Sequence, residues 1–147
     1  MDYDLPIMIA CDHAGFPLKD HLLKKFPRLQ WLDLGTDSED RVDYPDFASA
    51  LCEKMRENPG VRGVLICGSG QGMAMRANKY PWIRAALCWS QDSASLARQH
   101  NDANVLCLGS RLISQELAED LLHLFLTTPF EGGRHSERVE KVSSPVD

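Results

Sequence analysis

The segment Cys67-Gly68-Ser69-Gly70-Gln71-Gly72 combines a thiol, a hydroxyl and three glycines at alternate positions. Glycines at this spacing let the backbone approach a ligand closely and turn several N–H groups toward it. A helix that begins after Gly70 adds the positive end of its dipole. The segment therefore predicts an anion cradle, for a phosphate or for an oxyanion formed during a reaction. The alternative is a tight strand-to-helix turn without a ligand, although such a turn rarely needs three glycines.

Cys67 stands at the predicted junction between a strand and this cradle. A helix N-terminus favours the thiolate form of a cysteine, so Cys67 is a candidate base or nucleophile. Met73 excludes two other functions of the loop. A cysteine phosphatase needs an arginine at that position, and the dinucleotide fingerprint GxGxxG needs a glycine there. We therefore expect no nucleotide cofactor, and no cofactor of another kind.

Polar residues near two other predicted strand ends could share the same crevice. Asp12 and His13 follow the first predicted strand, and Tyr44 lies in Asp43-Tyr44-Pro45. For Asp12 the alternative is a helix cap, with His13 simply solvated. For Tyr44 the alternative is an aromatic ring packed in a loop.

Two segments further along the chain carry basic groups. His100 precedes Asn101 at a predicted helix end, so it is either a helix C-terminal cation or an acid–base group. No HxxxH pattern or comparable ligand cluster joins it, so the sequence predicts no metal site. Arg134 and Arg138 are four residues apart and share one face of a helix. They form either a phosphate clamp or part of an exposed charged tail.

The composition limits the class of protein. The chain has 147 residues, which suits a single domain over 1–147, and its 44% hydrophobic residues are typical of a globular protein. A net charge of −5 argues against nucleic acid and anionic membrane as partners. No apolar stretch approaches the roughly 20 residues of a membrane span. The acidic N-terminus also lacks the features of a signal peptide.

The cysteines indicate a cellular compartment. Five are present, which is an odd number, and no CxxC pair occurs. A disulfide framework and a zinc site are therefore poor interpretations, and we expect a reducing, cytoplasmic environment. Cysteines other than Cys67 are expected to be small core residues.

Apolar runs alternate with helical patterns along the chain. Strands are predicted over 7–11, 30–34, 61–67, 83–88 and 105–108. Strands apolar on both faces, alternating with helices, predict an α/β fold: a three-layer α/β/α sandwich around a five-stranded parallel Rossmann-like sheet. A helical tail is expected from Arg134 to Val142, and residues 143–147 have no evident packing partner. Ligands of such sheets bind at the carboxyl ends of the strands, where the cradle is predicted.

Taken together, these segments resemble type B ribose-5-phosphate isomerase, in the family that includes the galactose-6-phosphate isomerase subunits. The resemblance spans nearly the whole chain in order. It rests on these segments: Cys11-Asp12-His13-Ala14-Gly15-Phe16, Asp43-Tyr44-Pro45, Ile66 to Gly72, Ala77-Asn78-Lys79, Arg98 to Leu106, Leu108 to Arg111, and Phe130 to Val139.

The resemblance implies a metal-free aldose–ketose isomerisation of ribose 5-phosphate and ribulose 5-phosphate through an enediolate. It assigns Cys67 as the base between C1 and C2, Ser69 as a proton shuttle, and His100, assisted by Asp12, as the ring-opening group. The remaining residues would bind the substrate: the enediolate at Gly68, Gly70, Gln71 and Gly72, sugar hydroxyls at Tyr44 and Asn101, and the phosphate at His13, Arg134 and Arg138, with Arg111 lining the site. The cradle then holds the reaction intermediate instead of the phosphate.

The resemblance also implies a homodimer or a dimer of dimers with shared active sites. Ser69 stands where many members carry threonine, which also supplies a hydroxyl. Some members use a carboxylate a few residues after the cysteine position, but Met73 occupies that place here, which strengthens the assignment to Cys67. A hexose 6-phosphate isomerase and a non-catalytic sugar-phosphate-binding protein remain the alternatives.

Overall fold

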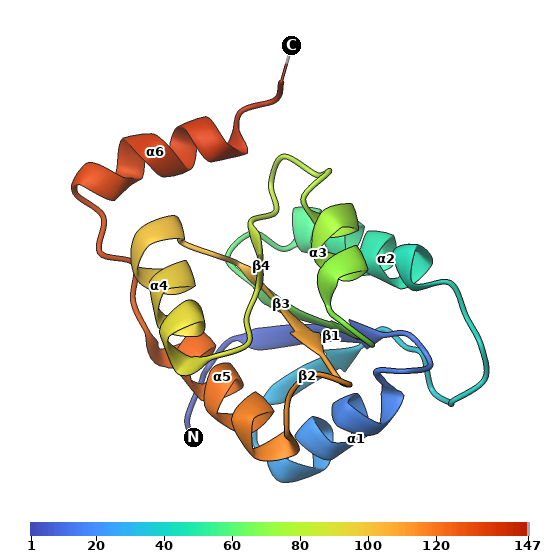
Figure 1. Cartoon of the computed structure of the whole chain (residues 1–147). Coiled ribbons are helices and arrows are strands. Elements are labelled where there is room, and N and C mark those ends of the chain that lie inside the picture. The colour runs from blue at the N-terminus through green and yellow to red at the C-terminus, as the bar shows by residue number, and fades with distance from the viewer. Residues whose placement is uncertain (147) are drawn as a thin grey trace.

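The computed structural model describes residues 1–146 and contains a five-stranded parallel sheet in the order β2-β1-β3-β5-β4 (Figure 1). The strands are β1 (Pro6–Cys11), β2 (Gln30–Asp33), β3 (Arg62–Cys67), β4 (Ala85–Leu87) and β5 (Val105–Gly109). The helices are α1 (Phe16–Lys25), α2 (Tyr44–Glu57), α3 (Gln71–Ala77), α4 (Gln91–Asn101), α5 (Gln115–Thr127) and α6 (Arg134–Ser143). The predicted three-layer α/β/α fold and its helical tail are confirmed.

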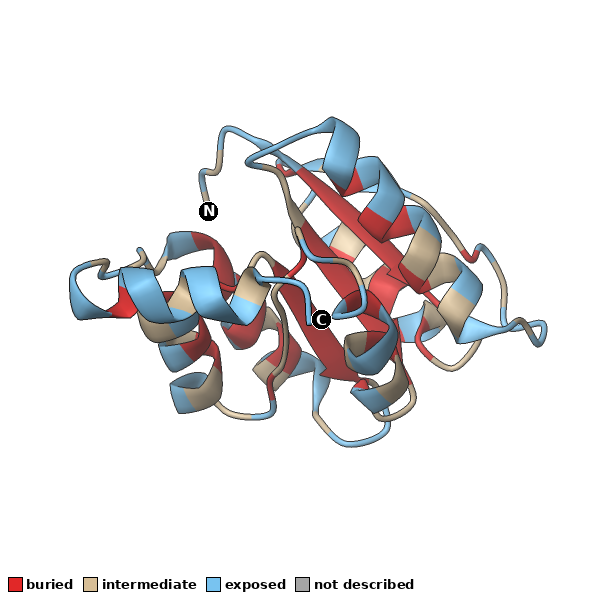
Figure 2. Ribbon diagram, turned by 90° about the horizontal axis from the view of Figure 1, so that it is seen from above, coloured by how far each residue is buried: buried red, intermediate tan, exposed pale blue. Residues whose placement is uncertain are grey.

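Alternate residues of each central strand pack on opposite sides of the sheet. In β3, Val64 and Ile66 join a core cluster with α1, α4 and α5. Leu65 and Cys67 of the same strand join a second cluster with α2 and α3. Because a strand points successive side chains to opposite faces, burial on both faces requires the continuous apolar run that the sequence contains. Figure 2 shows the buried residues concentrated along the sheet and on the helix faces that cover it.

The chain reverses its direction of winding between β1 and β3. From β1 it crosses to β2 on one side, and from β3 it moves through α3 to the opposite edge of the sheet. The carboxyl ends of β1 and β3 therefore flank a topological switch point, where ligands of such sheets bind. Asp12 and Gly68 are the first residues beyond these two strands.

β4 at the sheet edge is shorter than the predicted 83–88. The backbone N–H of Arg84 donates to the side-chain oxygen of Asn104 at 2.7 Å, outside the strand ladder. The side chain of Asn78 pairs with both backbone groups of Ala85, at 2.9 Å each. This pairing blocks part of the open sheet edge, which otherwise presents free backbone groups to other chains.

Side-chain caps begin α4 and α5, whereas α1, α2, α3 and α6 have no side-chain cap at the N-terminus. Ser90 is the N-cap of α4, and its hydroxyl accepts a hydrogen bond from the N–H of Ser93. Asp12 does not cap α1, whose N-cap is Gly15. Its carboxylate instead accepts a hydrogen bond from the N–H of Gly15 at 2.9 Å, which closes the turn before the helix.

The contacts of the C-terminal segment with the rest of the chain extend beyond Val142, where the predicted helical tail ends. Helix α6 projects from the sandwich beside α4 (Figures 1 and 2). Ser143 was expected to lack a partner but ends α6, and its hydroxyl accepts a hydrogen bond from Arg84 at 3.3 Å. The expectation for Asp147 lies outside the described residues. Among the residues that the structure describes, no helix is long and apolar enough to cross a membrane.

Lys19 is a buried charge that forms an ion pair with Asp33. Its side chain is 1% exposed, and its Nζ lies 2.6 Å from Oδ1 of Asp33, whose side chain is 41% exposed. The same Asp33 oxygen accepts the N–H of Gly35 and so holds the turn after β2.

We predict that Asp33→Ala destabilises the fold more than Lys19→Met. Removing Asp33 leaves a buried ammonium without a partner, which costs about 3 kcal/mol. Lys19→Met replaces that ammonium with an apolar chain of similar length and leaves a carboxylate that water reaches. Urea unfolding of the two variants measures the difference. Equal losses would show that the burial of Lys19 is not the controlling factor.

Candidate active site

Backbone hydrogen bonds join the cradle after β3 to the loop after β5. The N–H of Ser110 donates to the carbonyl of Cys67 at 2.9 Å, and that of Arg111 to the carbonyl of Gly68 at 3.0 Å. A Cβ on Gly109 would lie 2.6 Å from the carbonyl oxygen of Ser69. Gly70 is in the left-handed region at φ +77° and is the N-cap of α3. Glycine suits the left-handed conformation at residue 70, and only glycine leaves room for the close approach at residue 109.

Cys67 presents its thiol at this turn. The side chain belongs to the core cluster and is 5% exposed. The sulfur accepts a hydrogen bond from the N–H of Gly70, with an N–S distance of 3.2 Å. It opens onto a cavity of about 360 Å³ lined by Asp12, Tyr44, Cys67, Gly68, Ser69, Gly72, Arg111 and Leu112. The cavity has room for a small phosphorylated metabolite.

The other cysteines are core residues, as predicted. All are free and buried. Burial raises the pKa of Cys11 to about 11, of Cys52 to about 12 and of Cys88 to about 11. Burial also raises the pKa of Cys107, which lies near Cys88. These thiols stay protonated near neutral pH and are unsuited to act as bases.

Asp12 and Tyr44 enclose the cavity from β1 and α2. The backbone N–H of Asp12 donates to the carbonyl of Ile66 at 3.1 Å, which ties the end of β1 to β3. Tyr44 is the first residue of α2, and its hydroxyl would lie 2.7 Å from a Cβ on Gly72. The ring therefore packs against the cradle and also lines the cavity, so the two interpretations of Tyr44 are compatible.

Arg111 brings positive charge to the cradle. A Cβ on Gly68 would lie 2.9 Å from its Nη1, so the guanidinium covers this glycine. His13 is next to Asp12 but does not line the same cavity. Its Nδ1 accepts a hydrogen bond from the N–H of Val42 at 3.2 Å, which leaves Nε2 as the donor in the neutral imidazole.

Ser69 and Gln71 of the predicted cradle line a neighbouring hollow. Gln71 lines this hollow together with Trp89 and Leu112, while Ser69 contacts both spaces. The hydroxyl of Ser69 accepts a hydrogen bond from the N–H of Gln71 at 3.3 Å. This hydrogen bond holds the Ser69 hydroxyl within the cradle.

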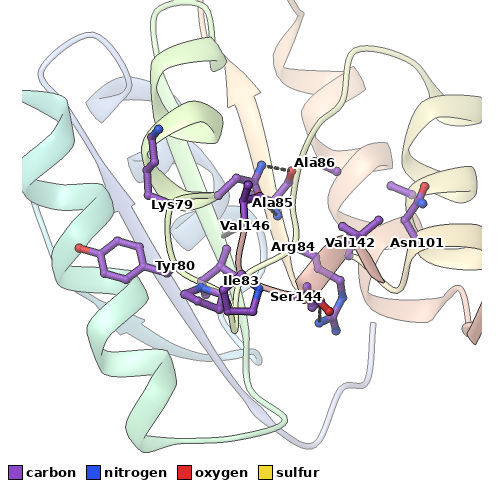
Figure 3. A pocket seen from close by; sticks show the side chains of 16 residues that line it. Lys79, Tyr80, Ile83, Arg84, Ala85, Ala86, Asn101, Val142, Ser144 and Val146 are labelled. Atoms are coloured by element: carbon purple, nitrogen blue, oxygen red, sulfur yellow. Dashed lines mark hydrogen bonds between the residues drawn. The ribbon is translucent and has the colours of Figure 1, made fainter. Parts of the chain in front are cut away.

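His100 and Asn101 lie at the far end of α4. The helix follows β4 at the carboxyl edge of the sheet and precedes β5, so its last residues are near the amino edge. Eleven helical residues span about 16 Å. Asn101 lines a different cavity, of about 680 Å³, which Figure 3 shows between the α3–β4 connection and the end of α6. Within one chain, these residues are separate from Cys67.

Arg134 and Arg138 lie on α6, where they begin the helix and follow one turn later. Both are exposed, and α6 packs beside α4. The structure thus divides the predicted site into two groups. One surrounds Cys67, and the other joins His100 and Asn101 with the arginines of α6.

The prediction that no cluster of metal-ligating residues accompanies His100 is wrong. The imidazole rings of His100 and His135 stack with centroids 4.3 Å apart and planes 13° apart. Both rings also face Glu131, whose carboxylate lies within 4.0 Å of each. Burial and the neighbouring His100 lower the pKa of His135. Sequence spacing could not reveal this cluster, because 30 residues, which include β5 and α5, separate His100 from Glu131.

Comparison with known proteins gives consistent matches over almost the full chain. The sequence model of the family described as Ribose/Galactose Isomerase matches residues 7–142. A protein of Mycoplasma pneumoniae named probable ribose-5-phosphate isomerase B is 48% identical over 145 residues, which cover 97% of this chain and 95% of that protein.

Solved structures have the same fold. A crystal structure of a ribose 5-phosphate isomerase from Thermotoga maritima has a TM-score of 0.93 and 45% identity, covering 96% of this chain and 99% of that one. The crystal structure of ribose-5-phosphate isomerase B from Mycoplasma genitalium with bound ribulose-5-phosphate has a TM-score of 0.89 and 40% identity, covering 97% and 96%.

We predict that Gly70→Ala destabilises the protein more than Gly60→Ala. Both glycines have positive φ, and an alanine in that region costs about 1–2 kcal/mol. No atom of the described residues 1–146 lies within 4 Å of a Cβ added at Gly60, whereas at Gly70 the Cβ would meet Leu87 Cδ1 at 2.6 Å and the Leu108 carbonyl carbon at 2.9 Å. Urea unfolding measures the loss of stability in each variant, and the difference between them is the cost of the steric overlap at Gly70. Equal losses of stability would argue against the close approach.

Proposed function

The chain belongs to the ribose/galactose isomerase family, and we propose that it interconverts ribose 5-phosphate and ribulose 5-phosphate. The main observation in support of this function is the position of the Cys67 thiol on a glycine cradle at the switch point of the sheet. The bound ribulose-5-phosphate in the Mycoplasma genitalium relative supports a sugar phosphate as substrate.

In the proposed reaction, Cys67 removes the proton from C2 of open-chain ribose 5-phosphate and returns it to C1. The electron pair left on carbon forms an enediolate, whose negative charge lies on oxygen. Backbone N–H groups of Gly68 to Gly72 stabilise that charge, and Ser69 moves a proton between the two sugar oxygens. A positioned base and a preformed oxyanion site are what this proton transfer requires. The hydrogen bond that Gly70 donates to the sulfur supports the thiolate role of Cys67.

The phosphate and the sugar ring are assigned to other groups. His13, Arg134 and Arg138 bind the phosphate, and Arg111 lines the site. His100 opens the furanose ring with the assistance of Asp12, while Asn101 and Tyr44 contact sugar hydroxyls. Contacts remote from the reacting carbons orient the substrate and contribute to the rate.

We propose that two chains form each complete site. The path of α4 carries His100 away from Cys67 of its own chain, so a second chain must supply one group. Large apolar side chains exposed beside the cradle support burial against a partner: Met75, Trp89 and Leu112. A homodimer or a dimer of dimers satisfies this requirement, because a two-fold axis creates two equivalent shared sites.

The reaction as proposed needs no metal or organic cofactor, because the chain itself supplies the base, the acid and the oxyanion donors. The free, buried cysteines support a reducing, cytoplasmic location.

The first test is turnover of ribose 5-phosphate by wild type and Cys67→Ala in the presence of a chelator. We expect metal-free wild type to be active and Cys67→Ala to lose about 10²–10⁴-fold in kcat while still binding the sugar phosphate. Cys107→Ala is the matched control, because Cys107 is fully buried and does not line the cavity. Unchanged turnover in Cys67→Ala would exclude this base. Faster turnover of allose or galactose 6-phosphate would favour the hexose phosphate, and binding without any turnover would indicate a sugar-phosphate-binding protein.

The second test mixes two inactive variants, Cys67→Ala and His100→Ala. If sites are shared, a mixed dimer contains one site with both groups intact, and random exchange restores about a quarter of wild-type activity. The variants are unfolded and refolded together, and each is refolded alone as a control. Absence of recovery despite exchanged subunits would mean that both groups act within one chain.

A further inference from the structure

Three metal-ligand atoms converge at the end of α4, outside the cavity of Cys67. Nε2 of His100 lies 3.8 Å from Oε1 of Glu131, and Nε2 of His135 lies 3.6 Å from the same oxygen. One ligand atom from each of the three residues lies within 4.8 Å of the other two. Both nitrogen–oxygen distances exceed those of ordinary hydrogen bonds, so the groups are close without being bonded to one another.

The backbone holds the segments that carry these groups. The N–H of Glu131 donates to the carbonyl of Gln99 at 3.1 Å, which fixes Glu131 beside the end of α4. The N–H of His135 donates to the carbonyl of Gly132 at 3.0 Å. Gly132 has a positive φ and makes the turn that leads into α6. The three ligands are therefore brought together by the fold before any ion binds.

We propose that His100, Glu131 and His135 bind a transition-metal dication such as Zn²⁺, and that this ion inhibits the enzyme. Two imidazoles and one carboxylate are a common ligand set for zinc with an open fourth position. Zn–N bonds of about 2.0–2.1 Å place neighbouring ligand atoms roughly 3.3 Å apart in a tetrahedron. The ligand atoms must therefore move slightly closer to one another when the ion binds.

The exposure of the ligands permits that movement. His135 is 9% exposed and forms the fixed side of the site, whereas His100 and Glu131 are 40% and 50% exposed. Because the two rings are nearly parallel, the His100 ring turns out of the stack so that both nitrogen lone pairs point at one ion. Arg134 and Arg138 on the same helix as His135 oppose the positive ion, which favours reversible binding.

Inhibition follows from the proposed function and rests on it. His100 is the group proposed to exchange a proton with the sugar ring. When Nε2 of His100 donates its lone pair to Zn²⁺, that nitrogen can neither accept nor deliver a proton. The ion thus blocks ring opening without any change at Cys67.

Metal binding is tested directly with Co²⁺ and Zn²⁺ on the full-length protein. We expect visible absorption bands of four-coordinate Co²⁺ without a sulfur-to-cobalt charge-transfer band, and displacement of Co²⁺ by Zn²⁺. Glu131→Ala and His135→Ala should each weaken binding by roughly tenfold or more, since even changes to outer-shell groups have such effects. His123→Ala, at an exposed histidine of α5, is the control and should bind like wild type.

Two results would overturn the proposal: a charge-transfer band that places the metal on a cysteine, or unchanged affinity in both ligand variants. Glu131 is exposed, so its variant remains informative if His135→Ala fails to fold. For inhibition, Zn²⁺ should abolish wild-type turnover of ribose 5-phosphate, a chelator should restore it, and Glu131→Ala should need roughly tenfold more Zn²⁺. Equal sensitivity of that variant would contradict inhibition at this site. If metal-free wild type shows no turnover, the proposed function fails, while the Co²⁺ spectrum still decides the metal site.

Discussion

The close approach of two backbone segments at the carboxyl ends of β3 and β5 is the constraint on which the site depends. Hydrogen bonds from Ser110 to Cys67 and from Arg111 to Gly68 hold the segments together. No side chain fits at Gly70 or Gly109 at this separation. The N–H of Gly70 consequently reaches the sulfur of Cys67. A site assembled from backbone groups is rigid, so its dipoles need little reorganisation when charge develops in a reaction.

The parallel sheet places this turn beside Asp12. Each central strand is buried on both faces by the two helical layers. Because the winding reverses between β1 and β3, the residues that follow these strands are neighbours at one edge. Tyr44, at the first turn of α2, then closes the cavity over Gly72. Core packing and site geometry therefore have the same physical origin.

A second consequence of the α/β arrangement is the separation of functional groups between two edges. Helices return the chain to the amino edge, so a residue at a helix end, such as His100, cannot share an edge with a residue at a strand end. Helix α6 extends this second group by packing beside α4 and stacking His135 on His100. The two groups meet only if chains associate, which makes assembly a requirement of the proposed mechanism. The same arrangement leaves His100 beside Glu131, where a metal ion can compete with its proton transfer.

Patterns in the amino-acid sequence were enough to predict the layers, the strands and the importance of the turn after Cys67. These features depend on local signals: apolar runs for doubly buried strands, and glycine spacing for a tight turn. The sequence did not determine the role of Asp12 as a turn acceptor, the short β4, or the contact of Ser143 with Arg84. Nor could it show that His100 lies beside Glu131 and His135, or that His100 and Asn101 lie far from Cys67 of the same chain. The Asp12 contact is local, because its partner Gly15 follows three residues later. The other relations depend on distances between segments far apart in the chain, and tertiary packing, including that of α6 beside α4, decides them.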